Sequence, residues 1–433
     1  MSDKTTLIFT GDSFITRQLP KDGYDGFGEI SDIIKAHDVA FTSIETTVHD
    51  NKGYAEAVSG GTWAMAKPEV LDSLKDYGIN LINTATNHSM DFGHGGLLAT
   101  IENLKERDIT FAGTGENLYE ASKPAYVETK NARIAMIGVS SSFSPNSPAG
   151  AQRADFKGRP GLNPLRFKTV YNVCHEHFEA LKKVATATGM NAALERSIKN
   201  GFTPPLKDDE LPFAGLNFKL SDKNGAITSP DTKDVQRIIA SIEEARRQAD
   251  FVIVSFHSHE SRDGDSTKTP LFAEEFARIC IDNGADIIAG HGPHELRGVE
   301  VYKGKPIFYS LGNFIFQNET VEYQPSDAYE KLGMTDNDTV GAYMDKRSKN
   351  GTSGFAVQPL IWTSVMASLT VENGEITQIK LHPIDLHMEK SRGQKGFPTL
   401  KRDNEILKYL GELSKPYGTR FEISGTEAVI ELR

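Results

Sequence analysis

Short apolar runs alternate with amphipathic stretches along the first third of the chain. The runs are rich in β-branched residues, as is typical of strands, and they cover residues 6–10, 39–44, 79–85, 109–113 and 132–140. The stretches between them, such as 68–78 and 95–108, carry apolar residues at helical spacing. This alternation predicts an α/β fold in which helices cover the faces of a sheet.

The same alternation returns after residue 233. Helical patterns over 234–250 and 270–284 alternate with strand-like runs over 251–257 and 285–290. Residues 299–316 then predict a hairpin that turns at Lys303-Gly304, and residues 367–384 predict another with Asn-Gly at its centre. We therefore expect the two blocks to be halves of one fold.

Two segments break the alternation. Residues 141–233 start with a stretch rich in Gly, Pro, Ser and Arg, which predicts an ordered loop, followed by a helical pattern from about 169 to 200. Residues 320–353 are polar and predict a mobile loop. The expected division is a first half of the core (1–140), a substrate-facing insertion (141–233), a second half (234–319), and a part with the mobile loop, closing hairpin and terminal helix and strand (320–433).

The composition and charge disfavour some classes of binding partner. The 433 residues carry a formal net charge of −11, with 25% charged and 38% hydrophobic residues. An acidic chain disfavours binding to nucleic acid or to anionic membranes, and no run approaches the length of a membrane span. Without a leader at the first residues, the expectation is a cytoplasmic protein with a small anionic substrate. Association of identical chains stays open.

Polar residues with metal-binding side chains follow the predicted strands. They are Asp12, Glu45, Asn87 with His88, His257 with His259, and His291 with His294. Taken singly, such an Asp or Asn more often caps a helix, and such a His is more often an ordinary polar residue. Carboxyl ends of neighbouring strands, however, lie along one edge of an α/β sheet. Five strands that end alike predict nitrogen and oxygen donors for Zn, Mn or Fe.

Six short motifs occur in an order that resembles one known family. They are GDS (11–13), SIE (43–45), TNHSMDFG (86–93), FHSHE (256–260), GHGPH (290–294) and YSLGNFIF (309–316). Together they resemble the CapA family, the poly-γ-glutamate capsule-biosynthesis branch of the calcineurin-like metallophosphoesterases. The resemblance implies a four-layer α/β/β/α sandwich with a large insertion between its halves and a metal site at the strand ends.

The resemblance also implies roles for single residues. The implied ligands are Asp12, Glu45 and His294 for a first metal, and Glu45, Asn87, His257 and His291 for a second. His88 corresponds to a catalytic histidine that does not bind metal and lies near the leaving group. Asp91, three residues on, either orients the His88 ring or caps a helix.

Two positions depart from the wider superfamily. Phe14 stands where the superfamily has a histidine, and Glu45 stands where it has the shorter Asp. The first metal then keeps three protein ligands, so both one ion and two ions stay open. The identity of the metal among Mn, Zn and Fe stays open as well.

Other residues are candidates for contact with substrate. His259 lies two residues beyond His257 and so on the same side of a strand, where it is either a spare ligand, a substrate contact or a solvent-exposed side chain. Arg153, Arg159 and Arg166 in the insertion are candidates to clamp a phosphate or carboxylate.

Three functions fit this pattern. The first is a phosphoesterase that uses a metal-activated water. The second is a metal-dependent hydrolase of amide bonds, γ-glutamyl ones in view of the resemblance. The third is a non-enzymatic component of poly-γ-glutamate synthesis or export.

Overall fold

Two large sheets carry most of the chain in a computed structural model that describes residues 4–432. The first has the order β23–β24–β21–β20–β1–β2–β5–β6, with β19 beside β1 and β22 beside β21. Its strands are β1 (Lys4–Phe14), β2 (Val39–Ile44), β5 (Leu81–Asn83), β6 (Thr110–Ala112), β19 (Asn313–Phe316), β20 (Thr363–Glu372), β21 (Glu375–Asp385), β22 (Thr399–Leu400), β23 (Phe421–Ser424) and β24 (Glu427–Ile430).

The second large sheet has the order β17–β18–β16–β15–β9–β8. Its strands are β8 (Ala125–Glu128), β9 (Arg133–Ser140), β15 (Phe251–His257), β16 (Ile287–His291), β17 (Leu296–Tyr302) and β18 (Lys305–Leu311). Strands β1, β2, β5 and β6 are parallel neighbours in the first sheet, as β9, β15, β16 and β18 are in the second. The strands predicted from the alternating pattern are therefore present.

The two sheets share one hydrophobic core. Phe9 and Phe41 of the first sheet belong to the same buried cluster as Met136 and Ile253 of the second. Burial of each such side chain contributes about 1.5–3 kcal/mol. This shared core brings the sheets together and so aligns their strand ends.

Helices cover the other faces of both sheets. α1 (Phe27–Lys35) and α2 (Val70–Tyr77) pack in a cluster with Ile8, while α7 (Thr232–Gln248) and α8 (Leu271–Asp282) pack in a cluster with Val254. The remaining helices of eight or more residues are α3 (Gly93–Glu106), α5 (His175–Thr188), α6 (Ala192–Lys199), α10 (Val340–Arg347) and α11 (Glu405–Ser414). The chain is thus a mixed α/β protein with several sheets.

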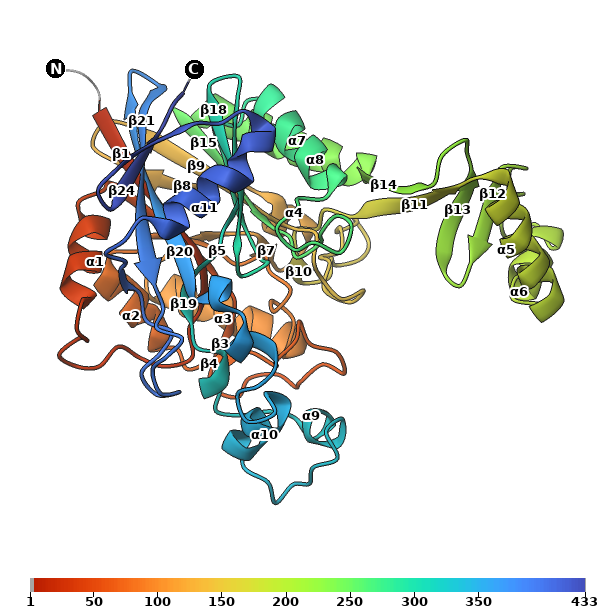
Figure 1. Ribbon diagram of the computed structural model, residues 1–433, viewed down its shortest axis with the longest axis horizontal. Helices are drawn as coiled ribbons and strands as arrows, with labels where there is room; N and C mark the ends of the chain where they lie inside the picture. Colours follow the sequence, from red (N-terminus) through yellow and green to blue (C-terminus); the bar gives the residue numbers. More distant parts are fainter. Residues whose placement is uncertain (1–3, 433) are drawn as a thin grey trace.

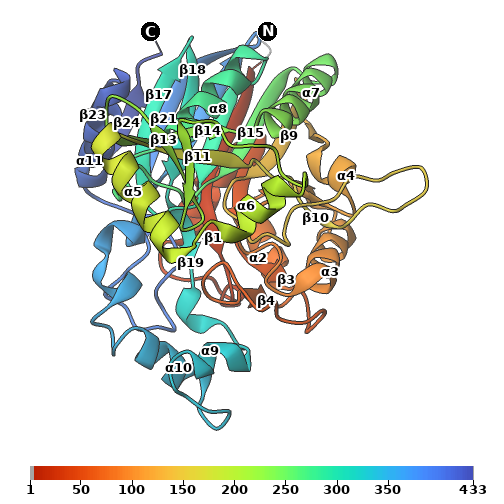
Figure 2. The ribbon, with the colours of Figure 1, turned by 90° about the vertical axis from the view of Figure 1, so that its right-hand side faces the viewer.

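A separate small sheet projects from the body on the right of Figure 1, and in Figure 2 it faces the viewer. We call residues 167–230 the arm; its strands are β11 (Phe167–Val173), β12 (Glu210–Phe213), β13 (Leu216–Leu220) and β14 (Gly225–Pro230), in the order β12–β13–β11–β14. The helical pattern predicted from about residue 169 is wrong at its start. FKTVYNV alternates with period two and pairs with β14 as a strand before α5 begins.

The C-terminal third contains the closing elements. The hairpin of β20 and β21 turns at Asn373 and Gly374, both with positive φ, and Lys303 and Gly304 adopt the same conformation between β17 and β18. The polar segment 320–353 forms two short helices, α9 (Ser326–Glu330) and α10. Among residues 4–432, the helices all fall short of the length and apolar character needed to cross a bilayer.

Candidate metal centre

Seven of the predicted site residues meet where the parallel strands of the two sheets end. Asp12 lies on β1, His257 on β15 and His291 on β16. Glu45 follows β2, Asn87 and His88 follow β5, and His294 follows β16. Because both sheets point the carboxyl ends of these strands to the same place, residues as distant along the chain as Asp12 and His294 become neighbours.

Glycines allow the backbone around Asp12 to pack this closely. A Cβ on Gly11 would lie 1.8 Å from the carbonyl oxygen of Gly312, so no other residue fits there. Gly292 has a φ of +124° and donates its N–H to Asp12 Oδ2 at 2.7 Å. These contacts explain why the GDS and GHGPH motifs contain glycine beside their candidate ligands.

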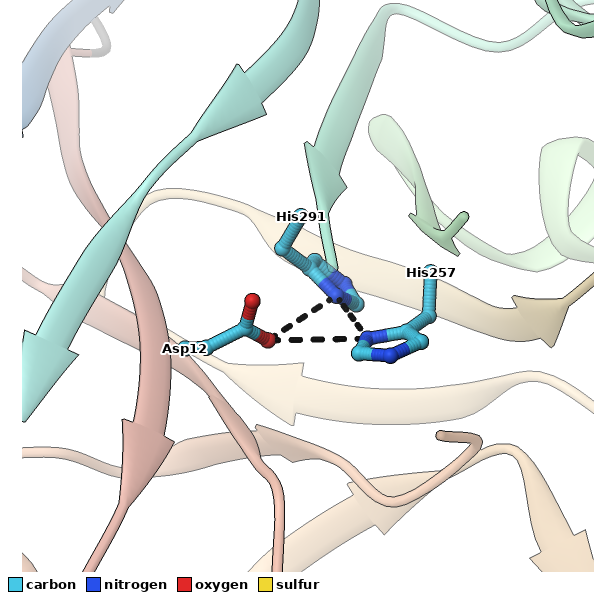
Figure 3. Close-up of side chains that lie close together, drawn as sticks. All are labelled: Asp12, His257 and His291. Carbon is cyan, nitrogen blue, oxygen red and sulfur yellow. Dashed lines mark hydrogen bonds and ion pairs between the residues drawn. The ribbon is translucent and has the colours of Figure 1, made fainter. Parts of the chain in front are cut away.

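Figure 3 shows Asp12, His257 and His291 pointing toward one another. Asp12 Oδ1 lies 3.3 Å from His291 Nδ1 and 3.5 Å from His257 Nδ1, and all three side chains are completely buried. The two imidazole Nδ1 atoms are 2.9 Å apart. Ser255 on β15 orients His291 through a 2.7 Å contact with Nε2.

Glu45 joins the other histidines to this group. Its Oε2 lies 3.5 Å from His294 Nδ1, and its Oε1 lies 3.6 Å from His257 Nε2 and 3.5 Å from His259 Nε2. Asn87 Oδ1 contacts His257 Nε2 at 2.9 Å. Donor atoms within 4.8 Å of one another form three sets at this place: Asp12/His257/His291, Asp12/Glu45/His294 and Glu45/His257/His259. The side chains of these sets are buried except for His259, which is partly exposed.

The electrostatics of these carboxylates fit a bound cation. Burial alone would raise the pKa of Asp12, but the close imidazoles of His257 and His291 hold it well below its ordinary value. Burial raises the pKa of Glu45 to about 8, although His294 opposes the shift. Asp12 Oδ1 and both carboxylate oxygens of Glu45 are buried without a hydrogen-bond partner among the described residues. Buried polar atoms are normally paired, so these orphaned oxygens suit a divalent cation bound with imidazole ligands.

His88 and Asp91 form a separate buried pair beside these ligands. His88 Nδ1 lies 2.6 Å from Asp91 Oδ2. Burial lowers the pKa of His88, but the charge and hydrogen bond of Asp91 outweigh it and the net pKa is raised. Asp91 accepts hydrogen bonds from the N–H groups of Gly60 at 3.0 Å and Ala64 at 2.8 Å, and the N-cap of α3 is Phe92. Asp91 thus contacts the imidazole of His88 and does not occupy the N-cap of α3.

Phe14 packs on this pair. Its ring meets the His88 ring edge to face, with centroids 5.4 Å apart, and meets Phe316 at 6.0 Å. The position that holds a histidine in the wider superfamily is therefore filled by apolar packing. On that side, the remaining candidate ligands are Asp12, Glu45 and His294.

A cavity of about 490 Å³ opens beside Asn87 and Asp91. Its wall includes Ser142, His259 and Glu260, with the apolar side chains of Val58, Met90 and Phe143. Within residues 4–432, its lining contains no Lys or Arg. The cavity is large enough for a small substrate beside Asn87 and His259.

The three arginines proposed as a substrate clamp have other partners. Arg153 pairs with Asp155 at 2.8 Å, and both side chains are exposed. Arg159 donates to the carbonyl oxygen of Pro148, while Arg166 makes a two-bond contact with Asp234, each bond 2.7 Å. The structure therefore does not bring these guanidinium groups to the cavity. Their N–H groups instead donate to nearby carboxylate and carbonyl oxygens.

Two supporting residues were missed in the sequence. Asn313 Oδ1 lies 3.0 Å from His294 Nδ1, and its Nδ2 donates to the carbonyl oxygens of His294 and Ile361. Asn313 is part of the YSLGNFIF motif, so its place in that motif could have indicated a role at the site. Ser255 lies two residues before His257 and shares its face of β15, which only strand periodicity could have indicated.

The model of the bacterial capsule synthesis protein family PGA_cap matches residues 6–318. The chain belongs to the PGA_cap family. The matched range contains every one of the candidate ligands and the His88–Asp91 pair.

Relatives of this PGA_cap protein occur in several bacteria. The uncharacterized protein y4sH of Sinorhizobium fredii (strain NBRC 101917 / NGR234) is 32% identical over 445 residues, covering 99% of this chain and 94% of that protein. The PGA biosynthesis protein CapA of Bacillus subtilis (strain 168) is 26% identical over 364 residues, covering 83% of this chain and 72% of that protein. The capsule biosynthesis protein CapA of Bacillus anthracis is 26% identical over 322 residues, covering 73% of this chain and 60% of that protein.

Proposed function

We propose that this protein is a metal-dependent hydrolase, and that its chemistry is that of a phosphoesterase. The observation that supports the proposal is a set of unpaired carboxylate oxygens, Asp12 Oδ1 and both oxygens of Glu45, buried among imidazoles next to the His88–Asp91 pair. The two sheets with a shared core and outer helices suit the four-layer sandwich implied by the resemblance.

One or two divalent ions would be held by six residues: Asp12, Glu45, Asn87, His257, His291 and His294. A divalent cation, when bound here, polarises the electrophile and lowers the pKa of a water molecule toward 7. Ser255 and Asn313 keep His291 and His294 turned toward the site. Since the described residues that line the cavity include no Lys or Arg, the charge of a phosphate would be met by the cation.

His88 is proposed as the general acid. Asp91 accepts the hydrogen bond from Nδ1, which leaves Nε2 as the nitrogen that can deliver a proton to the leaving group. The raised pKa of His88 keeps the protonated form populated at higher pH than in a free histidine. The packing of Phe14 against the ring excludes water from one of its sides.

A second candidate is hydrolysis of γ-glutamyl amide bonds. The names of the Bacillus relatives, which refer to PGA and capsule biosynthesis, favour it. The same ligands and the same general acid serve a carbonyl carbon and an amine leaving group as they serve phosphorus and an alkoxide.

A substrate panel separates the candidates. Nitrophenyl phosphate and bis-nitrophenyl phosphate are assayed with Mn, Zn or Fe, beside release of glutamate from a γ-linked oligomer. The proposal expects metal-dependent turnover of a phosphate ester, abolished in His88→Ala. Glutamate release alone supports the second candidate, and an inert metal-loaded protein supports a non-enzymatic role.

A further inference from the structure

We propose that His259 is a metal ligand, and that Glu45, Asn87, His257 and His259 hold one cation at the base of the cavity. This inference rests on the proposed function only in that the site takes a metal. The family resemblance assigns no ligand at position 259, and the sequence left His259 open between a spare ligand, a substrate contact and an exposed side chain.

The donor atoms of these four residues are spaced like ligands of a single ion. His257 Nε2 lies 2.9 Å from Asn87 Oδ1 and 3.0 Å from His259 Nε2. Glu45 Oε1 lies 3.6 Å from the first imidazole nitrogen and 3.5 Å from the second. Bonds of about 2.0–2.1 Å from zinc to nitrogen place neighbouring ligands of a tetrahedral ion about 3.3 Å apart.

A proton on His257 Nε2 can satisfy only one of the contacts that this nitrogen makes. An imidazole nitrogen carries one N–H at most, yet His257 Nε2 faces the Asn87 oxygen, the Glu45 oxygen and the His259 nitrogen together. Glu45 Oε1 is completely buried and has no hydrogen-bond partner among the described residues. One cation at this point would use all of these lone pairs at once.

The backbone that carries His259 is held rigidly. The His259 N–H donates to Ser142 Oγ at 2.7 Å, and Glu260 accepts hydrogen bonds from Ser141, Ser142 and Ser258. Beneath them, the buried guanidinium of Arg297 donates to the Glu260 carbonyl oxygen at 2.7 Å. A ligand supported in this way is already in position when the metal arrives.

His259 also supplies an imidazole in place of the one that is absent at position 14, where this chain has Phe14. Phe14 removes one imidazole from the Asp12 side of the site, where the superfamily has a histidine. His259 adds an imidazole on the Asn87 side, next to the cavity of about 490 Å³. The cation at Glu45, Asn87, His257 and His259 therefore faces the substrate cavity.

Metal affinity and coordination test the inference without reference to turnover. His259→Ala and the volume-conserving His259→Phe are titrated with Zn²⁺ and Mn²⁺ by calorimetry, and loaded with Co²⁺ for visible absorption. Both variants are expected to bind Zn²⁺ at least about tenfold more weakly, with a changed Co²⁺ spectrum. The control is His387→Ala, which disrupts the remote set Asp385/His387/Glu389 and should leave both readings at the wild-type value.

Three results would overturn the inference. The first is wild-type metal affinity and an unchanged Co²⁺ spectrum in folded His259 variants. The second is a change in KM alone, which would assign His259 to substrate binding. The third is a wild-type chain that binds no divalent metal. Weaker metal binding in the His259 variants, combined with a wild-type protein that turns over none of the substrates, would support His259 as a ligand and contradict the proposed hydrolase.

Discussion

At the scale of residues, the proposed metal ligands and the proposed general acid form two separate groups. Asp12 and His291 face each other inside the cluster, whereas His88 is tied to Asp91 beside it. The two groups depend on different contacts, so a change in one need not disturb the other. Substitutions can therefore assign the roles individually.

His88→Ala should abolish turnover and leave metal content intact, because the imidazole is proposed to move a proton and not to bind the ion. Loss of a general acid lowers the rate by about 10²–10⁴-fold. The measurement pairs steady-state kinetics with elemental analysis of protein purified without chelator.

His291→Ala is the matched comparison, since it removes an implied ligand at the end of β16. This variant should lose both metal and turnover. Equal metal content in His88→Ala and His291→Ala would contradict the assigned roles.

At the scale of elements, an ion pair fastens the arm to the body. Asp234 on α7 is completely buried and accepts from Arg166, at the foot of β11, and from Arg237. Burial alone would raise the pKa of Asp234, but hydrogen bonds from both guanidinium groups lower it on balance. The pair thus stabilises the fold where the arm leaves the core.

Asp234→Asn should destabilise the protein by about 1.5–3 kcal/mol at neutral pH, the range for hydrogen bonds to charged groups. The folded pKa of Asp234 is depressed, so its stabilisation is present above the unfolded value near 3.9 and is lost as the pH falls through the folded pKa. Urea unfolding between pH 3 and pH 7 should show the gap between wild type and variant closing toward acid. A gap that stays constant would rule out this electrostatic origin.

The arm should be dispensable for metal binding. Its entry and exit are paired, Phe167 opposite Pro230 and Lys168 opposite Ser229, so a two-residue turn can join the shortened strands. Replacing residues 170–227 with Asn-Gly should leave metal content unchanged, as measured by elemental analysis alongside circular dichroism. Loss of metal from a folded variant would show that the arm reaches the site.

The sequence predicted strands and their polar ends better than it predicted contacts between residues that are distant along the chain. The runs that end in Asp12, Glu45 and His257 were visible because each parallel strand is buried and apolar up to its polar end. The β11 strand was read as helix because its short alternating pattern preceded a true helix. The partner of Arg166, Asp234, lies 68 residues away, and no local signal reveals such a contact.

At the scale of the whole molecule, the candidate site joins the two sheets. Asp12 and Glu45 come from the first sheet and His257 and His291 from the second, and the sheets otherwise meet through the apolar core. A cation here would bind the folded state and not the unfolded chain, so metal binding should stabilise the entire fold.

Removal of metal should lower the melting temperature. Binding to the folded state alone contributes about 2.7 kcal/mol when the free metal is 100 times its dissociation constant. Calorimetric scans before and after chelation, followed by readdition of metal, measure the effect. Identical melting curves in all three samples would show that no ion links the sheets.

The most direct measurement is anomalous diffraction from crystals grown with Mn²⁺ or Zn²⁺, with data collected on both sides of the metal absorption edge. We expect an anomalous peak among Asp12, Glu45, His257 and His291. Clear density for these side chains with no peak between them, at saturating metal, would contradict it.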